Sequence, residues 1–133
     1  MRCKIIVAGD ATVGKTSLTQ MFQSKGTVYP KNYKMTGSCD VHVVPVHIPD
    51  TATTAELFIC DVGGQDVFRD HVAQVCNGFG AIMLVYDSTN QKSFDNLPMW
   101  LELLKKQRPF KEKPIQGATL QTSSTRCALR LVA

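Results

Sequence analysis

The sequence IIVAGDATVGKT, residues 5–16, contains the spacing G-x-x-x-x-G-K-T directly after an apolar run. The apolar run predicts a buried strand, and apolar side chains at helical spacing predict a helix from Lys15 to about Gln23. A glycine-rich loop between a strand and a helix lets backbone N–H groups converge on phosphate oxygens. This stretch therefore predicts a phosphate-binding loop, in preference to a purely structural glycine turn.

Two side chains give this loop its chemistry. Lys15 is expected to reach the outer phosphates, and the hydroxyl of Thr16 is a candidate ligand for Mg²⁺. The loop backbone and the start of the helix supply the remaining contacts. The candidate nucleotide-binding residues of this segment are Ala11, Thr12, Val13, Gly14, Lys15, Thr16 and Ser17.

Apolar strands alternate with helical stretches along the rest of the chain. Strands are predicted near residues 41–48, 57–60 and 81–86, and Asn96 is a predicted cap for an amphipathic helix that ends near Lys105. The first two of these strands are expected to pair antiparallel at an edge of the sheet, because Pro45 lacks a backbone donor. The continuous apolar run at 81–86 is typical of a strand at the centre. The pattern predicts an α/β fold with a doubly wound, mostly parallel sheet.

A second motif, DVGGQ at residues 61–65, follows the strand predicted at 57–60. Ligands bind at the carboxyl edge of such a sheet. There, Asp61 is expected to hold Mg²⁺, the backbone N–H of Gly64 to contact a terminal phosphate, and Gln65 to orient an attacking water. By itself the motif is also compatible with a plain turn before a helix, but together with the upstream loop it predicts a nucleotide site.

Composition restricts the class of protein. A chain of 133 residues with a net charge of +4 suits one domain, and its scattered basic tail does not form the clustered patch that nucleic acid requires. The five cysteines show no paired spacing and are interpreted as reduced thiols. With no lipid-anchor motif evident, a cytoplasmic protein is expected.

From Arg2 to about Arg108 the chain resembles the Ras-like small GTPases, and the Rab-like branch most closely. The resemblance is carried by the phosphate loop, by residues 61–65 and by the stretch VYDSTN at 85–90 with Trp100. Within that branch the chain looks most like the Rab-like GTPase of intraflagellar transport. The DVGGQ stretch also resembles the Arf form.

The resemblance implies a molecular switch that binds GTP and GDP with Mg²⁺ and hydrolyses GTP slowly. Residues 29–40 correspond to the first switch, so Thr36 would close on Mg²⁺ and Tyr29 would lie against the guanine ring. Lys15 and Gln65 would be the catalytic residues, and Thr16, Thr36 and Asp61 the metal ligands. An arginine from an activating protein is implied, with Arg69 the one candidate within the chain.

The implied partners are guanine nucleotide and a protein effector or a subunit of a transport complex, in the cytoplasm or in a cilium. Ala11 and Thr12 occupy positions where smaller residues are usual, and crowding there is expected to slow hydrolysis further.

The chain departs from the family downstream, since the guanine-reading tetrapeptide Asn-Lys-x-Asp does not occur in it. We therefore expect an incomplete GTPase domain at residues 1–117, without the C-terminal strand and helices, and a divergent, poorly ordered tail at 118–133. Two functions remain open besides a GTP switch. One is an interaction module with little nucleotide affinity, a pseudo-GTPase or truncated isoform; the weaker one is an ATPase of another P-loop class.

Overall fold

The computed structural model describes residues 1–30, 32–106, 117–121 and 127–132, the last two ranges by their backbone alone. Strands and helices alternate along the chain, as the sequence predicts for an α/β fold. The elements are β1 (Arg2–Ala8), α1 (Lys15–Gln23), β2 (Cys39–His47), β3 (Thr54–Val62), η1 (Asp66–Phe68), α2 (Arg69–Val75), β4 (Ala81–Asp87), α3 (Gln91–Asp95), α4 (Leu97–Lys105), β5 (Gly117–Gln121) and β6 (Cys127–Val132).

The strands form one mixed sheet in the order β2-β3-β1-β4-β6-β5. β1 runs parallel to both of its neighbours, β3 and β4, whereas the pairs β2–β3, β4–β6 and β5–β6 are antiparallel. The expected mostly parallel sheet is therefore parallel only in its middle, where β1 lies between β3 and β4. The β2–β3 pair is antiparallel because the short connection at residues 48–53 reverses the chain between these consecutive strands. The edge position of β2, which carries Pro45, is confirmed.

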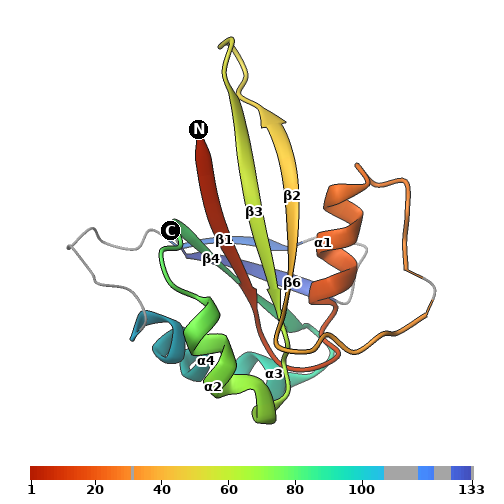
Figure 1. Cartoon of the computed structure of the whole chain (residues 1–133). Coiled ribbons are helices and arrows are strands. Elements are labelled where there is room, and N and C mark those ends of the chain that lie inside the picture. The colour runs from red at the N-terminus through yellow and green to blue at the C-terminus, as the bar shows by residue number, and fades with distance from the viewer. Residues whose placement is uncertain (31, 107–116, 122–126, 133) are drawn as a thin grey trace.

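Helices cover both faces of the sheet (Figure 1), with α1 on one side and α2, α3 and α4 on the other. Successive residues of β1 alternate between the two cores: Ile6 and Ala8 belong to the larger cluster, and Val7 belongs to the smaller one. A strand covered on both faces must be apolar at every position, which explains the unbroken run at residues 5–8. The doubly wound arrangement is confirmed.

The larger core lies between the sheet and helices α2 and α4. Trp100 and Leu104 of α4 are fully buried there, with Val72 and Cys76 at α2 and Ile82 of β4. The amphipathic helix predicted after Asn96 is confirmed, and its tryptophan is a core residue as the helical spacing indicates. Helices α2 and α3, of seven and five residues, were not predicted.

The sequence led us to expect that both the C-terminal strand and the C-terminal helices of the fold are missing. After α4, the described part of the chain contains two strands, β5 and β6, and no helix. The backbone of β6 pairs with β4, and β5 pairs with β6. The proposed division between a domain at 1–117 and a tail at 118–133 stays a prediction. Among the described residues, no helix combines the length and the apolar character needed to cross a bilayer.

Replacing Trp100 with Ala should destabilise the fold by about 3–5 kcal/mol, because a fully buried indole leaves a cavity that its neighbours fill only in part. The free energy of unfolding is measured by urea titration with far-UV circular dichroism, since Trp100 is the sole tryptophan. Val67→Ala is the matched control: Val67 is 71% exposed, and its truncation should change stability by less than about 0.5 kcal/mol. Equal losses in both variants would contradict the assigned core.

Candidate functional site

The phosphate loop connects β1 to α1 at the carboxyl end of the parallel strands. It leaves β1 at Gly9, whose φ is 146° and whose Cα lies so close to β4 that an added Cβ would sit 2.1 Å from the Val85 carbonyl oxygen. It enters α1 through Gly14, at φ 98°. No other residue type fits both positions without strain or a clash, so the glycine spacing seen in the sequence is a steric requirement of this turn.

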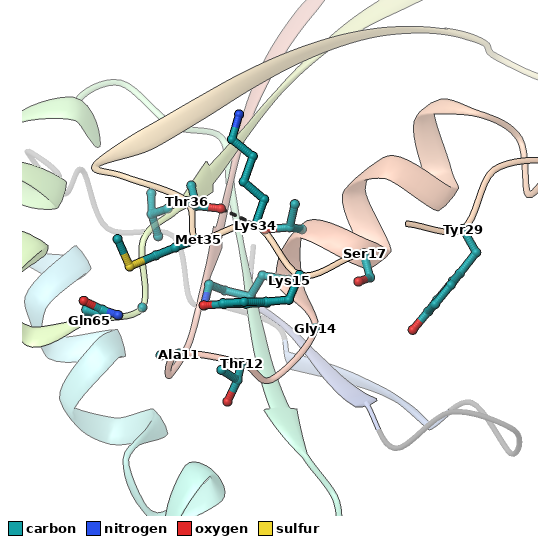
Figure 2. Close-up of a pocket in the computed structure, with 14 residues that line it drawn as sticks. Ala11, Thr12, Gly14, Lys15, Ser17, Tyr29, Lys34, Met35, Thr36 and Gln65 are labelled. Atoms are coloured by element: carbon teal, nitrogen blue, oxygen red, sulfur yellow. Dashed lines mark hydrogen bonds between the residues drawn. The ribbon is translucent and has the colours of Figure 1, made fainter. Parts of the chain in front are cut away.

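Lys15 begins α1 and is buried with 6% of its surface exposed. Its Nζ donates hydrogen bonds to the carbonyl oxygens of Gly9 at 2.9 Å and of Asp10 at 2.7 Å. The side chain therefore folds back over the loop (Figure 2), where the ammonium faces the space that the loop encloses. A buried cation in this position suits an anionic ligand.

Three predicted metal ligands meet beside this lysine. The hydroxyl of Thr16 donates to Asp61 Oδ2 at 2.5 Å, the Thr36 hydroxyl donates to the same oxygen at 3.4 Å, and the two hydroxyls are 2.9 Å apart. These residues come from the start of α1, the loop before β2 and the end of β3. Three segments far apart in the sequence are thus brought together by one carboxylate.

Asp61 has no solvent-exposed surface, and its buried Oδ1 finds no hydrogen-bond partner in the part of the chain that the structure describes. Burial raises the pKa of the Asp61 carboxyl, although the Thr16 hydroxyl and the Lys15 charge act in the opposite direction. A buried acceptor without a partner needs an explanation, and a bound ion is one. One carboxylate and two hydroxyls are hard oxygen donors of the kind Mg²⁺ takes, together with phosphate oxygens and water. The residues present fit that ion.

The second motif packs against both neighbouring loops. A Cβ added to Gly63 would lie 2.0 Å from the Gly37 carbonyl oxygen, and one added to Gly64 would lie 2.4 Å from the Ala11 nitrogen. Gly63 also donates its N–H to the Ser38 carbonyl oxygen at 3.2 Å. Both glycines are therefore needed for close backbone approach, which places residues 63–65 directly beside the phosphate loop.

The enclosed space is a cavity of about 190 Å³. That is smaller than the roughly 300–1,000 Å³ of sites that enclose a whole small molecule, so the cavity suits the phosphate end of a nucleotide. Figure 2 shows the loop, Lys15, Tyr29, Thr36 and Gln65 around it. The lining residues that the sequence predicted are Ala11, Thr12, Gly14, Lys15, Thr16, Ser17, Tyr29, Thr36, Gly64 and Gln65.

Two predicted site residues do not line the cavity. The side chain of Val13 is buried in the smaller core and does not face the cavity. Asp61 lies behind the cavity wall and reaches it through Thr16 and Thr36. Arg69 is also not among the lining residues: it pairs with Asp66, and its guanidinium lies 5.7 Å from the centre of the Trp100 ring.

Sequence reasoning missed four lining residues. One is Val62, the last residue of β3. The other three are Tyr33, Lys34 and Met35. They directly precede Thr36 in the loop between α1 and β2, so treating that whole loop as part of the site would have found them. Tyr33 is 71% exposed, and its lining position depends on how the loop folds over the cavity.

The support of the phosphate loop from α4 was also not anticipated. The Asp10 carboxylate accepts hydrogen bonds from Asn96 Nδ2 at 2.7 Å and from Trp100 Nε1 at 2.8 Å. Asn96 was predicted only as a helix cap and Trp100 only as a core residue. Their shared acceptor fixes the loop to the core, which no spacing in the sequence reveals.

Comparison with known proteins agrees with this geometry. A profile of the Ras family matches residues 4–121. Intraflagellar transport protein 27 of Chlamydomonas reinhardtii is 44% identical over 117 residues, which are 88% of this chain and 57% of that protein. Its human homolog is 40% identical over 109 residues, 82% of this chain and 59% of that protein. Ras-related protein Rab-28 of Caenorhabditis elegans is 33% identical over 113 residues, 85% and 44% of the two chains. The chain thus spans a little more than half the length of the two intraflagellar transport relatives.

Thr12 adopts φ 64°, a left-handed conformation that a β-branched residue rarely takes. Thr12→Gly should relieve strain of about 1–3 kcal/mol while adding about 0.5–1 kcal/mol of unfolded-chain entropy, so the variant should be more stable in urea titrations. Thr53→Gly is the control, because Thr53 is exposed and is not among the positive-φ residues of the described chain. Thr53→Gly should lower the free energy of unfolding. A Thr12→Gly variant that loses as much stability would contradict the strain assigned to Thr12.

The raised pKa of Asp61 makes stability depend on pH and on Mg²⁺. Without metal, the contribution of Asp61 is fully present below its unfolded pKa near 3.8 and is lost as pH rises through the folded value, since the buried carboxylate must then ionise. Mg²⁺ compensates the ionised form, so the rise in melting temperature on adding Mg²⁺ should grow with pH over the same range. Thermal melts at several pH values, with and without Mg²⁺, measure the pH dependence of stability and the rise in melting temperature.

Asp61→Asn should raise the melting temperature without Mg²⁺ at neutral pH and abolish the Mg²⁺ effect. The control Glu102→Gln changes an exposed carboxylate on α4 and should leave both the pH profile and the Mg²⁺ response intact. A Mg²⁺ response that persists in Asp61→Asn would place the ion elsewhere.

Proposed function

Because the chain belongs to the Ras family, we propose that it is a Rab-like switch that binds GTP and GDP with Mg²⁺ and hydrolyses GTP slowly. One observation carries the proposal. Lys15, Thr16 and Thr36 line a cavity of about 190 Å³, and the carboxylate of Asp61 lies directly behind the two hydroxyls. A cation beside hard oxygen donors at the start of a helix is the arrangement that binds a metal-complexed polyphosphate.

The proposed roles follow from these positions. Backbone N–H groups of the phosphate loop and Lys15 hold the β- and γ-phosphoryl groups, so that charge developing on the γ-phosphoryl oxygens meets fixed dipoles and one cation. Mg²⁺, when bound, neutralises part of that charge. Gln65 lines the same cavity and orients the attacking water.

Hydrolysis is proposed to be slow for two reasons. The lining residues of the cavity within the described chain include no arginine, because the Arg69 guanidinium is held against Trp100 and Asp66. In addition, Ala11 and Thr12 line the same cavity, and crowding by their side chains is proposed to slow hydrolysis further. An arginine from an activating protein would stabilise the transition state.

Switching is proposed to act through Thr36 and Gly64. Thr36 belongs to the loop before β2, and Gly64 is the second residue after β3, so a γ-phosphate that contacts both would order the two segments together. The intraflagellar transport names of the relatives support a role in that process, with a transport-complex subunit as partner and the cytoplasm or cilium as location.

A second function is favoured by one specific observation, the absence of Asn-Lys-x-Asp from the sequence. Loss of the guanine-reading aspartate removes charge-assisted hydrogen bonds and with them base discrimination. In this alternative the chain keeps the Ras-like surface and binds its partner constitutively, with little affinity for nucleotide.

Lys15→Ala should weaken nucleotide binding roughly tenfold to a hundredfold, because it removes hydrogen bonds from a charged donor worth about 1.5–3 kcal/mol. Titration of the purified chain with fluorescent GTP, GDP and ATP analogues, followed by anisotropy, measures the dissociation constants. Lys106→Ala, which removes an exposed lysine at the end of α4, is the charge-matched control and should change nothing.

Each outcome of this titration has a distinct meaning. A preference for GTP and GDP over ATP that depends on Lys15 supports the switch. Negligible or base-blind binding by the wild type supports the interaction module. Binding that is undiminished in Lys15→Ala contradicts the proposed site.

A further inference from the structure

Two side chains at α4 meet the phosphate loop at a single carboxylate. Asn96 directly precedes α4 and Trp100 lies four positions later, so both side chains are on the same face of the helix. Asn96 Nδ2 donates to Oδ2 of Asp10 at 2.7 Å, and Trp100 Nε1 donates to Oδ1 at 2.8 Å. Each oxygen of the carboxylate therefore has a donor of its own.

The main chain of Asp10 is held as well. Its carbonyl oxygen accepts a hydrogen bond from Lys15 Nζ at 2.7 Å. A Cβ added to Gly64 would lie 2.6 Å from the same oxygen and 2.4 Å from the Ala11 nitrogen. The peptide that joins residues 10 and 11 thus touches both the lysine and the segment that carries Gln65. Because Ala11, Lys15 and Gln65 all line the phosphate cavity (Figure 2), the orientation of this one peptide affects three parts of its wall.

The Trp100 ring provides a fixed support for these contacts. Trp100 has no exposed surface and belongs to the larger core, where close packing resists displacement. The guanidinium carbon of Arg69 lies 5.7 Å from the ring centre, and Arg69 pairs with Asp66. The same indole therefore contacts the phosphate loop through its N–H and the start of α2 through its ring.

We propose that Asn96 and Trp100 are positioning residues of the phosphate site. Neither residue lines the cavity, so both act through the Asp10 carboxylate. They hold the peptide between residues 10 and 11 in the orientation that directs Lys15 and the loop amides toward phosphate. The effect on nucleotide affinity rests on the proposed function, whereas the effect on the loop itself does not.

Charge and positioning predict opposite effects for Asp10→Asn. A carboxylate in the phosphate loop repels an anionic ligand, so its replacement by a neutral amide should strengthen nucleotide binding if charge decides. If positioning decides, binding should weaken, because the new amide presents an N–H group to one of the two donors. We expect binding at least about tenfold weaker, since misplacement of binding groups by about 1 Å can cost about a hundredfold.

A reciprocal exchange separates positioning from a general loss of stability. Asn96→Asp alone places two carboxylates against each other and should also weaken binding. In the double variant Asp10→Asn/Asn96→Asp, the amide at position 10 donates to the carboxylate at position 96 and still accepts from Trp100. Both hydrogen bonds return at the same net charge, so the double variant should bind within about threefold of the wild type.

The affinities are measured by the anisotropy of fluorescent GTP and GDP analogues with Mg²⁺. The matched control is Asp95→Asn, which changes an exposed carboxylate next to Asn96 that accepts a hydrogen bond from Gln91. This control should bind as the wild type does.

Trp100 supplies a direct spectroscopic readout. It is the sole tryptophan, so protein with ¹⁵N-labelled tryptophan gives one indole N–H signal in NMR spectra. Saturation of the wild type with GDP and Mg²⁺ should shift this signal, because the indole donates to the loop that would hold the phosphates. A signal that stays unchanged at saturation would overturn the proposal, even if the single variants do not fold.

Hydrogen exchange followed by mass spectrometry examines the loop without any ligand. The peptide that covers residues 9–16 should exchange faster in Asp10→Asn and in Asn96→Asp, while β3 exchanges at the wild-type rate. The double variant should restore the slower exchange, and Asp95→Asn should leave it unaltered. Equal exchange of this peptide in all of these proteins would overturn the positioning role.

The binding data decide the effect on nucleotide. Affinity that is unchanged or higher in both single variants would overturn the proposal, as would a double variant that loses as much as the two single variants together. If the wild type binds no nucleotide, the proposed function fails, and the exchange of residues 9–16 still decides whether α4 positions the loop.

Discussion

A buried negative charge constrains the whole site. Asp61 lies at the end of β3 inside the molecule, and its Oδ1 has no hydrogen-bond partner among the described residues. An ionised carboxylate persists in such a place only when neighbouring donors and cations compensate it. The donors are Thr16 of α1 and Thr36 of the loop before β2, so these segments must close on Asp61 together. A buried carboxylate with an unsatisfied oxygen is unfavourable by itself. The same unsatisfied oxygen makes the closed arrangement suited to a cation that is bound together with phosphate.

The phosphate loop is held on its other side by the core. Asp10 accepts hydrogen bonds from Asn96 and from Trp100, and Trp100 has no exposed surface. Gly63 and Gly64 press against the backbones on either side of the cavity. These close backbone contacts hold the phosphate loop, the loop before β2 and the segment after β3 against one another, in addition to the side-chain hydrogen bonds of the site.

The sequence predicted the elements that have strong periodicity. Helix α1 was predicted at its observed bounds, and α4 and the antiparallel β2–β3 pair were also found, because apolar spacing and turn residues mark them. Helices α2 and α3 were missed, since seven and five residues are too few to establish a helical period. At the site, the motif residues from Ala11 to Ser17 were found, whereas Tyr33 and Met35 were not, because no spacing rule marks residues that a loop brings over a cavity.

Local chemistry in the sequence determined that this chain has a phosphate loop, an aspartate at a strand end and an alternating α/β order. Those features depend on neighbours within a few residues, where glycine sterics and hydrophobic periodicity act directly. Only the tertiary structure decided that Thr36 meets Asp61 across 25 positions and that Asp10 is held by Trp100 across 90. Such contacts are set by strand register and by the packing of helices on the sheet, which arise from the whole core and from no single stretch of residues.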